Sequence, residues 1–203
     1  ATDLSLAQVS EFVFHLLKNM CGILAIFSPR QDLSILSQIV KSFQMLKNRG
    51  PDNGSLVLTD NDTLGFRRLA IMDTSVRGQQ PFYNDGTKLL CNGEIYNHKE
   101  LVETFNLTTS SNSDCACLLP LFARLGFELM LFQLNGDYSI ILSDGYMVYF
   151  ARDPIGVRPL FYGITASGGI ALASYARALT GLCADVQQVR PGWGTYDIAT
   201  GNI

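Results

Sequence analysis

Cys21 is the residue of this 203-residue chain best suited to act as a nucleophile, because a cysteine thiolate readily attacks carbonyl carbon. It directly follows Met20 and begins the apolar run CGILAIF. Taken alone, this setting favours a free cysteine buried as a small hydrophobic residue. A functional site is favoured instead by motifs that follow in order: RGPD at 49–52, RLAIMD at 68–73, GQQP at 78–81, NGEIYNH at 92–98, Ser113-Asp114, and DPIGVRPL at 153–160.

The polar residues of these motifs each have a chemical and a structural interpretation. The side-chain amide of Asn92 and the backbone N–H of Gly93 suit an oxyanion, but Asn-Gly is also a strong hairpin signal. The Arg68 guanidinium suits a carboxylate, although a lone arginine is more often a solvated surface charge. Asp114 also fits an N-terminal helix cap, and Arg49 fits a cation in the last turn of a helix. The residues alone leave these alternatives open.

Hydrophobic periodicity predicts the elements that must position these residues. Helical spacing of apolar residues predicts helices at 1–20, 32–48, 97–105 and 114–130. Short apolar runs predict strands at 21–27, 55–59, 63–72, 88–91, 138–143, 147–152, 160–162 and 169–173. Within the 63–72 strand, Arg67 and Arg68 would project to opposite faces, so both cannot enter one site. Hairpins outnumber strand–helix–strand units, which predicts mainly antiparallel sheets with helices packed outside them.

Composition sets the broad class of the protein. Hydrophobic residues make up 47% and charged residues 16%, which excludes general disorder. The length of 203 residues fits one large domain or, less comfortably, two small ones. The net charge of -3 argues against a nucleic-acid or membrane-surface partner, and no apolar run approaches the roughly 20 residues that cross a bilayer. Five irregularly spaced cysteines predict free thiols and a cytoplasmic location. No metal site is expected, because Cys115 and Cys117 splay apart on a helix and only His15 and His98 could add imidazole ligands.

Taken together, the ordered motifs resemble the glutaminase domain of the class II glutamine amidotransferases, which are N-terminal-nucleophile (Ntn) hydrolases. The resemblance covers residues 20–203, and NGEIYNH makes the chain most similar to the N-terminal domain of the glutamine-hydrolysing asparagine synthetases. It implies an α+β fold, a four-layer α-β-β-α sandwich with two mainly antiparallel sheets. It also implies that a domain at 21–203 hydrolyses L-glutamine to glutamate and ammonia through a cysteinyl thioester.

The resemblance implies a role for each candidate residue. Cys21 is the nucleophile, and Asn92 and Gly93 form the oxyanion hole. Arg68 binds the α-carboxylate of glutamine, and Asp114 binds its α-ammonium group. Further contacts in the glutamine pocket are implied for Arg49, Leu69, Ile71 and Glu94.

The first 20 residues depart from the family pattern. In the family the catalytic cysteine is the first residue of the mature protein, and its α-amino group is the general base. Here the nitrogen of Cys21 is joined to Met20 as an amide, and loss of a general base costs ~10²–10⁴ in rate. Residues 1–20 are therefore expected to be a propeptide, a tag or a mis-started segment. The alternative is a non-catalytic glutamine-binding or regulatory module with a blocked Cys21.

The resemblance also implies partners outside the glutaminase domain. No cofactor is expected in this domain, because ATP and magnesium would serve only an absent synthetase domain. That domain, or a partner protein, would use the ammonia for ATP-dependent asparagine synthesis. A homodimer is compatible with the resemblance.

Overall fold

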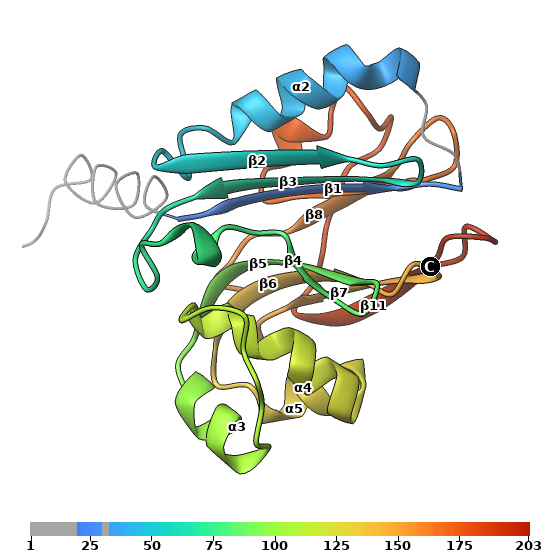
Figure 1. Ribbon diagram of the computed structural model, residues 1–203. Coiled ribbons are helices and arrows are strands. Elements are labelled where there is room, and N and C mark those ends of the chain that lie inside the picture. The colour runs from blue at the N-terminus through green and yellow to red at the C-terminus, as the bar shows by residue number, and fades with distance from the viewer. Residues whose placement is uncertain (1–19, 30–32) are drawn as a thin grey trace, which may run out of the picture.

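Two antiparallel sheets stack face to face between two layers of helices (Figure 1). The structure is a computed structural model that describes residues 20–29 and 33–203. The helix expected at 1–20 lies outside the described residues except for Met20. The layer order α-β-β-α confirms the predicted α+β sandwich.

The first sheet carries the cysteine and the arginine pair. Its six strands run in the order β10-β8-β9-β1-β3-β2, and its pairings are antiparallel. They are β1 (Gly22–Phe27), β2 (Asn53–Leu58), β3 (Asp62–Arg68), β8 (Phe161–Ile164), β9 (Ile170–Ala173) and β10 (Gln187–Gln188). β3 ends at Arg68, earlier than predicted, because the strands that pair with it begin at Gly22 and Asn53. The chain after Arg68 therefore leaves the sheet.

The second sheet carries the Asn-Gly motif. Its order is β11-β7-β6-β5-β4, with β4 (Phe82–Asn84), β5 (Thr87–Ile95), β6 (Gly136–Ser143), β7 (Met147–Arg152) and β11 (Gly192–Asp197). Asn92 and Gly93 lie inside β5, opposite Ser139 and Tyr138 of β6. The hairpin-turn interpretation of Asn-Gly is therefore wrong, and β5 extends four residues beyond the predicted Cys91.

Helices cover the outer face of each sheet (Figure 1). α2 (Leu36–Met45) packs on the first sheet through Ile39 and Phe43. The second sheet is covered by α3 (His98–Thr104), α4 (Leu118–Leu125) and α5 (Phe127–Gln133). The helix predicted over 114–130 is divided, because Gly126 adopts a positive φ of 75° that ends α4, and Asp114–Cys117 forms a 3-10 turn.

Apolar side chains fill the space between the two sheets. Residues of β1 and β3 in one sheet face residues of β5, β6 and β7 in the other, among them Phe27, Phe66, Leu90, Ile141 and Phe150. This core locks the two sheets together, so strand ends from both sheets meet at fixed positions. None of the helices in the described part of the chain combines the length and apolarity needed to cross a membrane.

Candidate active site

One cavity of about 70 Å³ gathers the predicted site residues from both sheets. It is lined by eight of them: Cys21, Arg68, Leu69, Ile71, Asn92, Gly93, Glu94 and Asp114. The first sheet supplies the start of β1 and the end of β3, and the second sheet supplies the end of β5. Residues far apart in sequence therefore meet because three strand ends converge.

The thiol of Cys21 lies against the chain that leaves β3. The backbone N–H of Leu69 donates to Cys21 Sγ at 3.3 Å, and Sγ lies 3.6 Å from the Leu69 carbonyl oxygen. Burial raises the pKa of the Cys21 thiol above its ordinary value, and the Leu69 hydrogen bond offsets only part of that rise. At neutral pH the thiol thus needs a base to take its proton.

No histidine in the described part of the chain is placed to serve as that base. His98 is the single histidine there, and its Nδ1 lies 3.0 Å from the Ile95 carbonyl oxygen. It does not line the cavity. The nitrogen nearest to the thiol by covalent structure is the backbone nitrogen of Cys21 itself, which here is an amide bonded to Met20.

Arg49 contacts the backbone of Cys21 and does not line the cavity. Its side chain is fully buried, its Nε donates to the Cys21 carbonyl at 2.8 Å, and its guanidinium lies 4.9 Å from the Tyr175 ring centroid. Burial lowers the pKa of Arg49 from its ordinary value. The interpretation as a cation in the last turn of a helix is wrong, because α2 ends at Met45, and Arg49 does not line the cavity.

Asn92 and Gly93 present two N–H donors to the cavity. The buried Asn92 amide satisfies its neighbours when Nδ2 donates to the Cys21 carbonyl at 3.0 Å and Oδ1 accepts from Arg49 Nη2 at 3.2 Å. An amide NH₂ carries two hydrogens, so a second bond from Nδ2 is available. A Cβ at Gly93 would lie 2.1 Å from the Asp137 carbonyl oxygen, so only glycine fits there.

The direction of the Gly93 N–H follows from strand geometry. Backbone N–H groups along a strand point alternately to its two edges, so those of Cys91, Gly93 and Ile95 share one edge of β5. β4 pairs with β5 only as far as Leu89. Beyond it, Cys91 N donates to Gln80 Oε1 at 2.6 Å and Ile95 N donates to Asp114 Oδ2 at 2.7 Å. The Gly93 N–H between them faces the cavity.

Two oppositely charged side chains stand at the cavity wall. Arg68 is buried, and its Nη1 donates to the Ser75 carbonyl at 2.7 Å. Arg67 points to the other face of β3, where its guanidinium lies 4.0 Å from the Phe43 ring centroid, as strand alternation predicts. Asp114 is buried and accepts a bond from β5, so it does more than begin a helical turn.

The structure adds residues that sequence reasoning did not assign to the site. Gln80, Cys91, Asp73, Cys115 and Arg158 also line the cavity. Gln80 and Arg158 belong to the GQQP and DPIGVRPL motifs, so the signal was present, but their contacts depend on strands that are distant in sequence. Within residues 20–29 and 33–203, no three His, Cys, Asp or Glu side chains are grouped as a metal site requires.

Comparison with known proteins agrees with this geometry. The model of the family described as "Glutamine amidotransferase domain" matches residues 20–192. A probable asparagine synthetase [glutamine-hydrolyzing] of Acanthamoeba polyphaga mimivirus is 43% identical over 189 residues, which are 89% of this chain and 34% of that protein. Asparagine synthetase [glutamine-hydrolyzing] of Zea mays is 35% identical over 192 residues, 91% of this chain and 32% of that protein.

A solved structure shares the fold at lower identity. The glutamine phosphoribosylpyrophosphate amidotransferase from B. subtilis superposes with a TM-score of 0.67 at 21% identity, over 89% of this chain and 50% of that one. The chain spans about a third of the length of the curated relatives it matches. The family match, the relatives and the shared fold lead to one conclusion: this chain belongs to the class II glutamine amidotransferase domain family.

Proposed function

We propose that this domain hydrolyses L-glutamine to glutamate and ammonia, with Cys21 as the nucleophile. The observation that carries the proposal is the single cavity in which the Cys21 thiol, the Asn92–Gly93 donors and the Arg68 and Asp114 charges converge. Arg68 would bind the α-carboxylate of glutamine, and Asp114 would bind its α-ammonium group. Leu69, Ile71 and Glu94 line the remaining wall.

The chemistry needs two displacements at the side-chain carbonyl of glutamine. Sγ forms a bond to the carbonyl carbon, and the oxygen becomes an oxyanion held by Asn92 Nδ2 and the Gly93 N–H. The C–N bond then breaks, and the proton taken from the thiol leaves with ammonia. Water attacks the resulting thioester, which releases glutamate and restores the thiol.

The general base in this proposal is the α-amino group of Cys21, which exists only after the bond to Met20 is cut. Its reference pKa of about 7.7–8.0 suits a base at neutral pH. The buried Met20 side chain lines the cavity, so its removal would free the amine and widen the space for substrate. The peptide bond between Met20 and Cys21 therefore blocks the proposed general base.

The domain is proposed to need no cofactor of its own. ATP and magnesium would be used by a synthetase domain or partner that consumes the ammonia to make asparagine. The support for this partner is the likeness to asparagine synthetases of which this chain spans about a third.

The test compares the full chain with a chain that begins at Cys21, after mass spectrometry has established both termini. Glutamate release from glutamine is measured from pH 5 to 9. The chain beginning at Cys21 should be active, with a rate that rises through about pH 7–8 as the amine loses its proton. The full chain should be slower by ~10²–10⁴.

Cys21→Ala in the chain beginning at Cys21 is the control, and it should release no glutamate. Equal activity in a full chain that keeps residues 1–20 would overturn the amine as base. Glutamine binding without hydrolysis in both forms would favour the alternative, a glutamine-binding module.

A further inference from the structure

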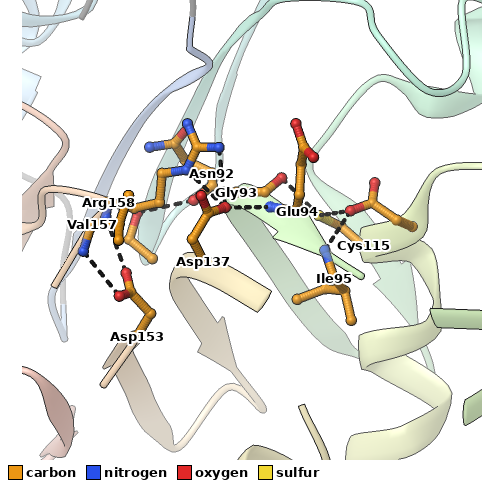
Figure 2. Close-up of polar contacts among 11 residues, drawn as sticks. Asn92, Gly93, Glu94, Ile95, Cys115, Asp137, Asp153, Val157 and Arg158 are labelled. Atoms are coloured by element: carbon orange, nitrogen blue, oxygen red, sulfur yellow. Dashed lines mark hydrogen bonds and ion pairs between the residues drawn. The ribbon is translucent and has the colours of Figure 1, made fainter. Parts of the chain in front are cut away.

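Asp137 and Arg158 form an ion pair at the cavity end of β5. Arg158 Nη2 lies 3.0 Å from Asp137 Oδ1, and Arg158 Nε donates to the same oxygen at 3.1 Å. Both side chains are less than a fifth exposed, at 14% and 17%. Asp137 Oδ1 also accepts from the backbone N–H of Glu94 at 3.3 Å (Figure 2). One carboxylate oxygen therefore joins Arg158 to the strand that carries the oxyanion donors.

The loop that carries Arg158 is itself held in place. The buried carboxylate of Asp153 accepts from the N–H groups of Val157 at 2.9 Å and Arg158 at 3.0 Å (Figure 2). Arg152 donates to the carbonyls of Gly156, Arg158 and Val189. The backbone that carries Arg158 is therefore fixed. The Arg158–Asp137 ion pair can then hold the Asp137 carboxylate, and the Glu94 N–H bonded to it, in place.

Gly93 and Glu94, which follow Asn92 in β5, lie close against β6 on one edge and beyond the end of β4 on the other. Gly93 and Glu94 pair with Tyr138 and Asp137 in the β5–β6 ladder, with no room for a Cβ at Gly93. On the opposite edge no strand in the described part of the chain pairs with Gly93, because β4 ends opposite Leu89. The direction of the Gly93 N–H is then set by the β6 contacts, together with the Gln80 and Asp114 side chains that hold Cys91 N and Ile95 N on the other edge.

We propose that Arg158 is a positioning residue that acts through Asp137 to hold Glu94 in β5, and so to fix the preceding residue Gly93, whose N–H is the proposed oxyanion donor. This inference rests on the proposed glutaminase function and deepens it. The ion pair would hold Glu94 N against β6, and thereby keep the Gly93 N–H aimed at the oxyanion and the Glu94 side chain at the pocket wall. Small displacements of such groups reduce rate strongly.

The same strand provides a matched control. Lys88 at the other end of β5 forms an ion pair with Asp62, and those side chains are 23% and 6% exposed. Neither of them lines the cavity. Breaking the Lys88–Asp62 pair removes one ion pair beside β5, as breaking the Arg158–Asp137 pair does, but it leaves the contacts of Gly93 and Glu94 intact.

The kinetic test uses the chain beginning at Cys21 with Arg158→Gln, Asp137→Asn, the double variant and Lys88→Gln. The first two should lower kcat by about ten- to a hundredfold with little change in KM, and the double variant should be no worse than either. Arg158→Lys should recover part of kcat, and Lys88→Gln should leave kcat unchanged. A rise in KM with kcat retained would overturn the proposal, because it would make Arg158 a substrate contact.

A second readout does not depend on activity. Amide hydrogen exchange in the full chain should be about tenfold faster at Glu94 in Arg158→Gln and Asp137→Asn, with other β5 amides unchanged. Lys88→Gln should not affect Glu94. Uniform acceleration along β5, or no change at Glu94, would overturn the positioning role. If the unmutated chain beginning at Cys21 lacks glutaminase activity, the proposed function fails while this exchange result still tests the alignment.

Discussion

The two ends of β5 have different partners on the edge that faces away from β6. At the end containing Lys88 and Leu89, the strand pairs with β4 on one side and with β6 on the other. At the end containing Cys91–Ile95, β6 continues but β4 has stopped, and the Gln80 and Asp114 side chains supply the missing partners. The first end is paired with backbone on both edges. At the second end, side chains of residues 20–29 and 33–203 supply partners for Cys91 N and Ile95 N but not for Gly93 N.

This difference shows how an antiparallel sheet can leave one backbone N–H of its edge facing a cavity. A buried backbone N–H without an acceptor costs about 1–3 kcal/mol, so an edge strand normally finds partners for each one. Gln80 also donates from Nε2 to the Cys91 carbonyl at 3.0 Å, which imitates a neighbouring strand for one residue. The Gly93 N–H faces the cavity, while side chains of the described residues supply partners for Cys91 and Ile95 on either side of it.

The largest effect is expected from adding a methyl group at Gly93. Gly93→Ala would place a Cβ 2.1 Å from the Asp137 carbonyl oxygen, so β5 and β6 must separate and the oxyanion donor must move. Glutaminase kcat of the chain beginning at Cys21 should fall by at least about a thousandfold, because both the donor and its alignment are lost.

Gly86→Ala is the control at the other end of the strand. Gly86 has a φ of 82°, and a methyl group added there would meet nothing within 4 Å, so only backbone strain of about 1–2 kcal/mol is expected. Its kcat should match the parent. Comparable losses of kcat in both variants would remove the distinction between the two ends.

A smaller effect is expected when the side-chain donor alone is removed. Asn92→Ala keeps the Gly93 N–H but deletes the amide that contacts the Cys21 carbonyl. Turnover should fall by roughly 10²–10³ with little change in KM, as for other oxyanion donors. Thr87→Ala on the same strand should leave both constants unchanged, and a change confined to KM for Asn92→Ala would contradict the oxyanion role.

The smallest effect is expected when the Gln80 side chain is removed, which pairs with Cys91 as a neighbouring strand would. Gln80→Ala leaves the N–H and C=O of Cys91 without their side-chain partner and should lower the free energy of unfolding by about 1–3 kcal/mol. Among the described residues, Gln79 Nε2 donates to Ser55 Oγ and to the Gln80 carbonyl and satisfies no backbone N–H, so Gln79→Ala should cost less. Urea unfolding of the four-layer domain measures the loss of unfolding free energy in both variants. Equal losses would show that the bonds of Gln80 to Cys91 add no stability beyond that of a neighbouring glutamine.

Much of the fold could be predicted from local patterns. β7 appears at its predicted bounds, and the opposite directions of Arg67 and Arg68 follow from strand alternation alone. The missed strands β4, β10 and β11 are short or rich in glycine, so their sequences carry little periodic signal. The end of β3 was missed because it depends on where two other strands begin.

By itself, the sequence determined the alternation of strands and helices and the ordered motifs whose resemblance to the family implied the nucleophile, the donors and the charges around it. The strands and helices are local features, since each depends on residue type and on spacing of a few residues. Only the tertiary structure decided that Arg49 stands behind Cys21, that Asn92 and Gly93 lie within a strand, and that Arg158 reaches Asp137. These contacts join segments that meet only when the core between the two sheets closes, because packing of distant strands fixes which edge is paired and which is left open.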